Sequence, residues 1–127
     1  MATIPDVALV NNAKLLGAVS GGAAYTHIAV GSGSTAEAVT DTALATELTT
    51  NGFARAAAAG AYEATAKCKW TKTFTATADS NTIREFGIFS ASENGTMGLR
   101  HVMTADKTVD DTETFTATIT ITCARAA

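Results

Sequence analysis

Few residues of this chain have side chains suited to acid-base or metal chemistry, and those few are poorly placed to share a site. His27 and His101 lie within apolar strand patterns, and neither has a His, Asp or Glu at metal-ligand spacing. We therefore expect each to be a surface or hydrogen-bonded core histidine. Four acidic residues have carboxylates suited to a divalent cation but lack the spacing of an EF-hand loop, which favours a solvated loop: Asp106, Asp110, Asp111 and Glu113.

The segment Gly31-Ser32-Gly33-Ser34 comes nearest to a phosphate-binding loop. The Gly-Lys-Ser/Thr sequence of such a loop does not follow it, so there is no lysine to contact a phosphate, and a plain loop is expected. Elsewhere the sequence nominates no nucleophile together with a base and an orienting group. It thus predicts a protein that is not an enzyme and that holds neither a cofactor nor a metal.

Cys68 and Cys123 are too few and too far apart for a disulfide framework or a four-thiolate zinc site. Each occupies an apolar-face position of a predicted strand, which is typical of an inert buried thiol. The competing hypothesis is a disulfide, formed within the chain if the two strands are neighbours or between subunits if the residues lie near an interface. Both alternatives remain open at this point.

The composition indicates one folded domain over residues 1–127. With 46% hydrophobic and 17% charged residues, the chain is too apolar for disorder. A net charge of -3 offers no basic surface for phosphates, which argues against nucleic acid as a partner. Because Asn11, Asn12 and Lys14 interrupt the N-terminal apolar stretch, neither a signal peptide nor a membrane span is expected, and folding in a cytoplasm is the default.

The spacing of apolar residues changes along the chain. A three- and four-residue spacing predicts a helix over about 6–18, beginning near Pro5-Asp6. A strand is expected over 25–30, and Asp41 is a plausible N-cap for a second short helix over 42–48. From Phe53 onward the period becomes two residues, which predicts successive strands, including an alanine-rich one over 56–59.

Later segments give clearer strand signals. Residues 67–76 and 115–123 each place apolar side chains on one face and mainly threonines or lysines on the other. Asn94-Gly95 separates two apolar runs and predicts a hairpin turn in preference to a glycosylation site. We therefore expect an all-β fold, an antiparallel β-sandwich or a jelly-roll-like barrel of about seven or eight strands, with one or two short helices near the N-terminus.

Several segments together resemble a family of small structural proteins and fibre-type modules of tailed bacteriophages. The matching segments are THIAVGSGST (26–35), DTALATEL (41–48), TIREFGIFSA (82–91), GTM (95–97) and RHV (100–102). The resemblance spans roughly residues 25–103, and the alternating C-terminal strand fits the usual ending of the family. This chain departs from the pattern by having Glu93-Asn94 at a hairpin tip that is otherwise glycine-rich, and by having the two cysteines.

The resemblance implies a virion structural protein, assembled in the host cytoplasm. Because the chain lacks a long coiled-coil or repetitive shaft, we expect a capsid decoration (cement) protein that binds the major capsid protein lattice and stabilises the head. A symmetric homo-oligomer, either a dimer or a trimer, fits this role. The alternative is a tail-associated protein, such as a fibre, baseplate or collar component that contacts other tail proteins or the host surface.

Two elements are candidates for contact with a virion partner. The N-terminal segment has an apolar stripe, and the segment from Gly31 to Thr40 has the composition of an exposed loop. The candidate interface residues in these two elements are Leu9, Val10, Leu15, Leu16, Ser32, Ser34 and Thr35.

Overall fold

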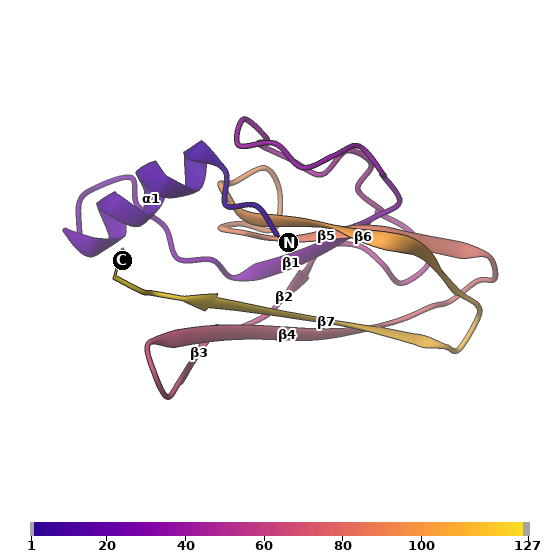
Figure 1. The fold of residues 1–127 in the computed structure, drawn as a ribbon. Coiled ribbons are helices and arrows are strands. Elements are labelled where there is room, and N and C mark those ends of the chain that lie inside the picture. Colours follow the sequence, from indigo (N-terminus) through magenta and orange to yellow (C-terminus); the bar gives the residue numbers. More distant parts are fainter. Residues whose placement is uncertain (1, 126–127) are drawn as a thin grey trace.

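Two antiparallel sheets face each other in this chain. The computed structural model describes residues 2–125, in which the strand orders are β2-β1-β5-β6 and β3-β4-β7 (Figure 1). Within these residues the two sheets do not join into a closed barrel, so the predicted all-β sandwich with a short N-terminal helix is confirmed. The elements are α1 (Asp6–Leu16), β1 (His27–Gly31), β2 (Ala56–Ala57), β3 (Ala61–Glu63), β4 (Lys67–Thr75), β5 (Asn81–Phe89), β6 (Met97–Val109) and β7 (Thr114–Thr122).

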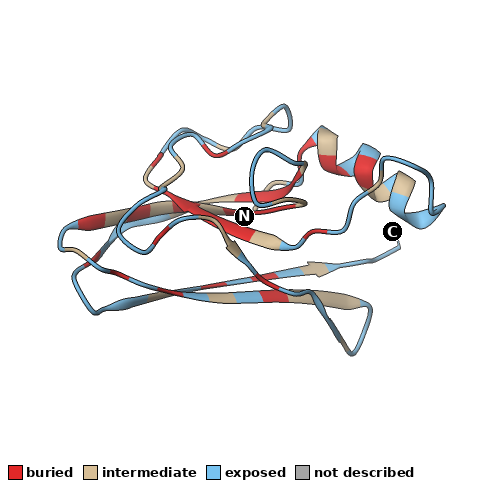
Figure 2. Cartoon of the chain, turned by 180° about the vertical axis from the view of Figure 1, so that it is seen from behind, coloured by how far each residue is buried: buried red, intermediate tan, exposed pale blue. Residues whose placement is uncertain are grey.

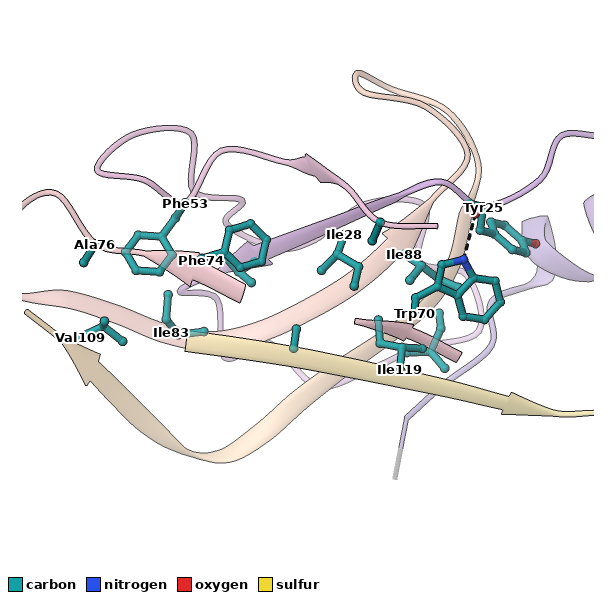
Figure 3. Packing of buried hydrophobic residues seen from close by; sticks show 14 residues of the cluster. Tyr25, Ile28, Phe53, Trp70, Phe74, Ala76, Ile83, Ile88, Val109 and Ile119 are labelled. Carbon is teal, nitrogen blue, oxygen red and sulfur yellow. Dashed lines mark hydrogen bonds between the residues drawn. The ribbon is translucent and has the colours of Figure 1, made fainter. Parts of the chain in front are cut away.

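The main core lies between the sheets and is built from alternate residues of the strands. Ile28 and Ile88 of the four-stranded sheet share a cluster with Trp70 and Ile119 of the three-stranded sheet (Figure 3). Successive side chains of a strand point to opposite faces, so the period-two sequence pattern yields one buried face per strand. The Trp70 Nε1 donates to the Tyr25 carbonyl at 2.9 Å, which satisfies the polar atom of the indole inside the core.

The outer faces of the two sheets differ. Helix α1 and the chain between β1 and β2 lie over the four-stranded sheet (Figure 1), where Leu44 packs against Ala29, Phe89 and Met97. The outer face of the three-stranded sheet is exposed (Figure 2) and is rich in threonine. Three directly opposed threonine pairs lie on it: Thr71 with Thr118, Thr73 with Thr116, and Thr75 with Thr114.

The turn expected at Asn94-Gly95 is confirmed. Asn94 and Gly95 have φ angles of 51° and 70°, in the left-handed region, and they lie in the loop of residues 90–96 that joins β5 to β6. The strands on either side, β5 and β6, pair antiparallel, with Ile88 opposite Leu99. A local sequence signal was therefore sufficient to place this hairpin.

The prediction of a second short helix over 42–48 is wrong. These residues form an irregular, bent segment whose end runs beside β1: the Ser32 N–H donates to the Thr46 carbonyl at 2.9 Å, and the Leu48 N–H donates to the Val30 carbonyl at 2.9 Å. The expected strand over 56–59 is shorter than predicted, because β2 contains only Ala56 and Ala57.

Replacing Ile88 by alanine is expected to lower the free energy of unfolding by about 2–5 kcal/mol, because Ile88 is fully buried and its loss leaves a cavity. Equilibrium denaturation in urea measures this change. The matched control is Thr71→Ala on the exposed threonine face, which is expected to cost less than about 1 kcal/mol. Equal losses for the two variants would contradict the assignment of the core.

Candidate interaction surface

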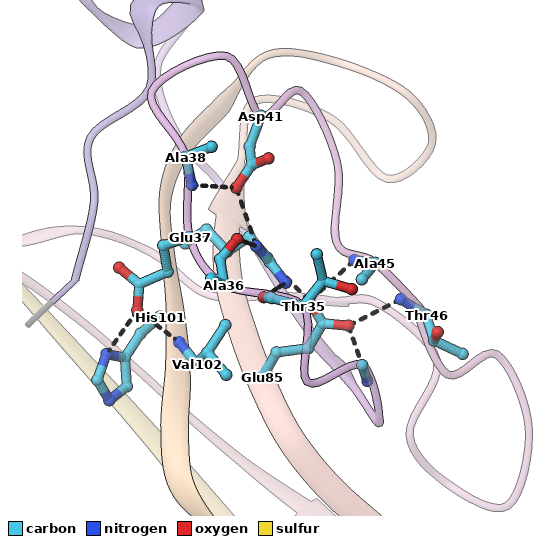
Figure 4. Close-up of polar contacts among 12 residues, drawn as sticks. Thr35, Ala36, Glu37, Ala38, Asp41, Ala45, Thr46, Glu85, His101 and Val102 are labelled. Atoms are coloured by element: carbon cyan, nitrogen blue, oxygen red, sulfur yellow. Dashed lines mark hydrogen bonds and ion pairs between the residues drawn. The ribbon is translucent and has the colours of Figure 1, made fainter.

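A buried carboxylate positions the long segment between β1 and β2. Glu85 of β5 is fully buried on the outer side of the four-stranded sheet. Its carboxylate oxygens accept hydrogen bonds from the backbone N–H groups of Gly33 (3.0 Å), Ala45 (2.9 Å) and Thr46 (2.7 Å) (Figure 4). In a helix over 42–48, the N–H groups beyond the first turn would bond to backbone carbonyls of the same helix. Here the carboxylate accepts the Ala45 and Thr46 N–H groups and holds the segment on the sheet. We name residues 32–47 the anchored loop.

Arg100 of β6 completes the charge balance around Glu85. Its Nε donates to Glu85 Oε1 at 2.9 Å and its Nη1 donates to Asp41 Oδ2 at 2.9 Å. Its Nη2 donates to the Thr35 carbonyl at 2.8 Å, so the guanidinium also holds the anchored loop by its backbone. Burial by itself lowers the pKa of Arg100, but hydrogen bonds and charges from Glu85 and Asp41 outweigh it and raise the pKa above its ordinary value. Arg100 therefore remains a cation inside the protein.

The structure explains why the Gly31-Ser32-Gly33-Ser34 segment contains two glycines. Gly31 and Gly33 are buried, and a Cβ at Gly33 would collide with Glu85 Oε2 and with Ala45 Cβ. Only glycine lets the backbone approach the carboxylate this closely. The segment thus receives a carboxylate of the same chain, and the expectation of a plain exposed loop is wrong for its two glycines.

A second set of contacts ties the anchored loop to β6 and to α1. Glu37 Oε2 accepts a hydrogen bond from the Val102 N–H at 2.8 Å and lies 3.5 Å from His101 Nδ1 (Figure 4). The ring of His101 also meets the Phe86 ring edge-on, with centroids 5.3 Å apart. The Asp6 N–H at the start of α1 donates to the Val39 carbonyl at 2.8 Å. Helix and loop therefore form neighbouring parts of one surface.

Helix α1 packs through small and polar residues and leaves large apolar ones outside. Ala8 and Asn11 are buried, and Asn11 exchanges two hydrogen bonds with the backbone of Ala23, at 2.8 and 2.9 Å. Leu15 follows on the same stripe by its helical spacing and is 39% exposed. The remaining candidates project away from the sheet: Leu9 is 57%, Val10 is 59% and Leu16 is 90% exposed. We name these three the α1 outer face.

The polar interface candidates lie in the anchored loop. Ser34 and Thr35 are exposed, whereas Ser32 is half-buried. The chain between β1 and β2, to which both exposed residues belong, lies on the same side of the four-stranded sheet as α1 (Figure 1).

Arg55 supports the far end of the anchored loop. It makes two hydrogen bonds to Glu47, at 2.7 and 3.1 Å, and its guanidinium lies 3.7 Å from the centre of the Phe89 ring. It also donates to the Ala91 and Asn94 carbonyls at 3.1 and 2.8 Å. Arg55 borders a groove of about 890 Å³, but four of its five N–H donors are used in these contacts. Its role in this structure is to position the loop.

The acidic residues near β6 and β7 serve the local structure. Asp106 lies within β6, where it pairs with Arg84 at 2.9 Å. The carboxylates of Asp110 and Glu113 accept hydrogen bonds from the backbone of Ser80 and Asp110, respectively. Within residues 2–125, no group of three or more His, Cys, Asp or Glu side chains is arranged to hold a metal ion.

Cys68 lies in β4, Cys123 follows the end of the adjacent strand β7, and both are free thiols. Cys68 lies opposite Ile121, whereas the Cys123 N–H bonds to the Ala66 carbonyl at 2.9 Å, so the cysteines are diagonal neighbours on one face. Cys68 is half-buried, but Cys123 lies just beyond β7 and is exposed, so the expectation of an apolar-face strand position is wrong for Cys123. The disulfide remains a prediction, and the condition for an intrachain bridge, that the strands be neighbours, is met.

No protein-family model matches the chain, and no curated protein matches its sequence. In the described part of the chain, no helix has both the length and the apolar character needed to span a membrane.

Sequence reasoning missed Glu85, Arg100 and Arg55, the residues that hold the anchored loop. A signal was present: Glu85 and Arg100 are charged residues inside apolar strand patterns. A charge in such a position needs a buried partner, since an unpaired buried charge is costly.

Loss of the Glu85–Arg100 pair is expected to lower the free energy of unfolding more than loss of any other ion pair among the described residues. Either Glu85→Gln or Arg100→Met should lower the free energy of unfolding by about 3–5 kcal/mol, because each removes one charge of a fully buried pair and leaves the other without its buried counter-charge. Lys69→Met, which removes one side of the exposed pair with Glu63, is the control and should cost less than about 1 kcal/mol. Urea denaturation measures all three. Hydrogen exchange should also become faster at the Ala45 and Thr46 amides in Glu85→Gln, and unchanged exchange there would contradict the anchoring role.

Proposed function

We propose that this chain is a bacteriophage virion structural protein that decorates the capsid, binding the outside of the head lattice through the α1 outer face. The observation that carries the proposal is the exposure of Leu9, Val10 and Leu16 on a helix that is fixed to a sheet. Exposed apolar side chains that cluster on one element mark an interaction site more often than scattered ones do. The resemblance of residues 25–103 to small phage structural proteins supplies the class of partner.

The surface is suited to contact because it is held rigidly. The ion pair of Glu85 and Arg100 holds the anchored loop, and the Asp6–Val39 hydrogen bond joins that loop to α1. A pre-ordered surface loses little conformational entropy when it binds. Binding to the assembled lattice but not to free subunits stabilises the shell by mass action. The partner in this proposal is the major capsid protein lattice, and the location is the virion.

Immunogold electron microscopy of particles from the source phage tests the location. Gold spread over the head is the expected result. Gold confined to the tail would contradict the decoration proposal and would favour a fibre, baseplate or collar component. Absence of the chain from purified particles would contradict both virion roles.

The double variant Val10→Ser/Leu16→Ser is expected to weaken binding to heads that lack this protein by about tenfold or more, because each side chain contributes apolar area to the contact. Co-sedimentation with such heads gives the affinity. The control is Tyr62→Ser, which removes a 79% exposed aromatic residue from β3 in the other sheet. Undiminished binding by the double variant would remove α1 from the contact.

A further inference from the structure

Strand β7 is an open edge of the three-stranded sheet. In the order β3-β4-β7 it pairs with β4 on one side, and no other strand of the described residues pairs with it on the other side. Its nine residues, Thr114–Thr122, include no charged residue, no proline and no glycine. Natural sheets usually protect such an edge with charges, prolines or bulges, because its free N–H and C=O groups are a template for another strand. The edge of β7 has none of these protections.

The hydrogen-bond pattern identifies which backbone groups are free. The Ala76 N–H donates to the Glu113 carbonyl and the Cys123 N–H donates to the Ala66 carbonyl, both at 2.9 Å. Odd-numbered residues at both ends of β7 therefore direct their backbone hydrogen bonds toward β4. Because bonding alternates from residue to residue in an antiparallel pair, the odd-numbered residues between them do the same. The even-numbered residues direct their N–H and C=O groups to the open edge. They are the threonines Thr114, Thr116, Thr118, Thr120 and Thr122.

The two sheets differ in width at this edge. Strand β1 lies across from β4, and β5 lies across from β7, so β6 extends beyond the three-stranded sheet. A groove of about 320 Å³ lies there, between β6 and the edge of β7. Its apolar lining comes from Ala2, Phe86, Leu99 and Ile119. The open edge of β7 is thus accompanied by an apolar groove.

The outer edge of β6 is already occupied. Thr3 exchanges two backbone hydrogen bonds with Arg100, at 2.9 and 3.0 Å, and the Val102 N–H donates to Glu37. The space beside β7 is therefore bounded by β6 and by the N-terminal residues. A single strand added to β7 would lie opposite β6. If a second copy of the chain paired edge to edge through β7, its own four-stranded sheet would occupy the position of β6.

We infer that β7 accepts an extended arm of another polypeptide as a fourth strand of the smaller sheet. Backbone hydrogen bonds from the even-numbered threonines bind the arm, and its alternate apolar side chains enter the groove. Asp111 and Glu113 lie at the start of β7, and Arg125 lies beyond its end, all three exposed. An antiparallel arm that complements these charges has basic residues toward its C-terminal end and an acidic residue toward its N-terminal end. This inference is independent of the proposed decoration of a capsid.

The test is selection from a random twelve-residue peptide display library on the full chain, followed by binding measurements with the enriched synthetic peptides. Enriched peptides should alternate apolar and polar residues. In the complex, hydrogen exchange followed by NMR should slow at Thr116, Thr118 and Thr120, with little change at the odd-numbered amides that β4 already protects. The control that leaves the protein unchanged is a peptide N-methylated at alternate amides. This peptide should not bind, because it lacks the backbone N–H groups that pair with β7.

Thr118→Pro removes one edge N–H and leaves the hydrogen bonds to β4 in place, because proline is tolerated at an edge position whose N–H faces solvent. It should weaken peptide binding about tenfold, whereas Val10→Ser/Leu16→Ser on α1 should bind normally. Failure to enrich any peptide that protects the even-numbered threonines would overturn the inference. Protection of those amides by raising the concentration of the chain alone would also overturn it, since the occupant would then be a second copy.

Discussion

The buried pair of Glu85 and Arg100 is the interaction on which the arrangement of the anchored loop over the four-stranded sheet depends. Two charges removed from water carry a large desolvation cost, which good geometry and further hydrogen bonds must offset. Here the carboxylate accepts three backbone N–H groups as well as the guanidinium, and the guanidinium also bonds to Asp41 and to backbone carbonyls. Because most of these partners belong to the anchored loop, satisfying the two charges requires the loop to lie on the sheet. The position of the loop beside α1 follows from that requirement.

The parts of the fold that could be predicted are those set by neighbours in the sequence. The alternation in β4 and β7 and the turn at Asn94-Gly95 depend on local backbone geometry, and both were predicted correctly. The 42–48 segment was not, because its conformation depends on Glu85, which is about forty positions away along the chain. Asp41 resembled a helix N-cap, but its carboxylate bonds to the Ala38 N–H and to Arg100. Local propensity is a weak guide where a buried charge recruits backbone donors.

In the candidate site, too, the features set by neighbours in the sequence were predictable and those set by distant residues were not. Helical spacing was sufficient to group the apolar residues of α1, but it did not separate the buried Ala8 and Asn11 from the exposed Leu16. That separation depends on Asn11, a polar residue that packs inward because it pairs with the backbone of Ala23. The apolar pattern alone places Asn11 on the solvent side, since buried polar groups need partners that a sequence does not display. The orientation of α1 that buries Asn11 leaves Leu9, Val10 and Leu16 exposed.

The α1 outer face lies over the four-stranded sheet, whereas the edge of β7 belongs to the three-stranded sheet (Figure 1). A chain that binds through two separated surfaces gains affinity from linkage, because the second contact forms at the high local concentration set by the first. Rigidity increases this gain, and the hydrogen bonds from Asp6 to Val39 and from Trp70 to Tyr25 fix the helix side and the sheet side of the molecule to the same core. Under the two proposals above, this sandwich would join two neighbours more tightly than either surface would bind alone.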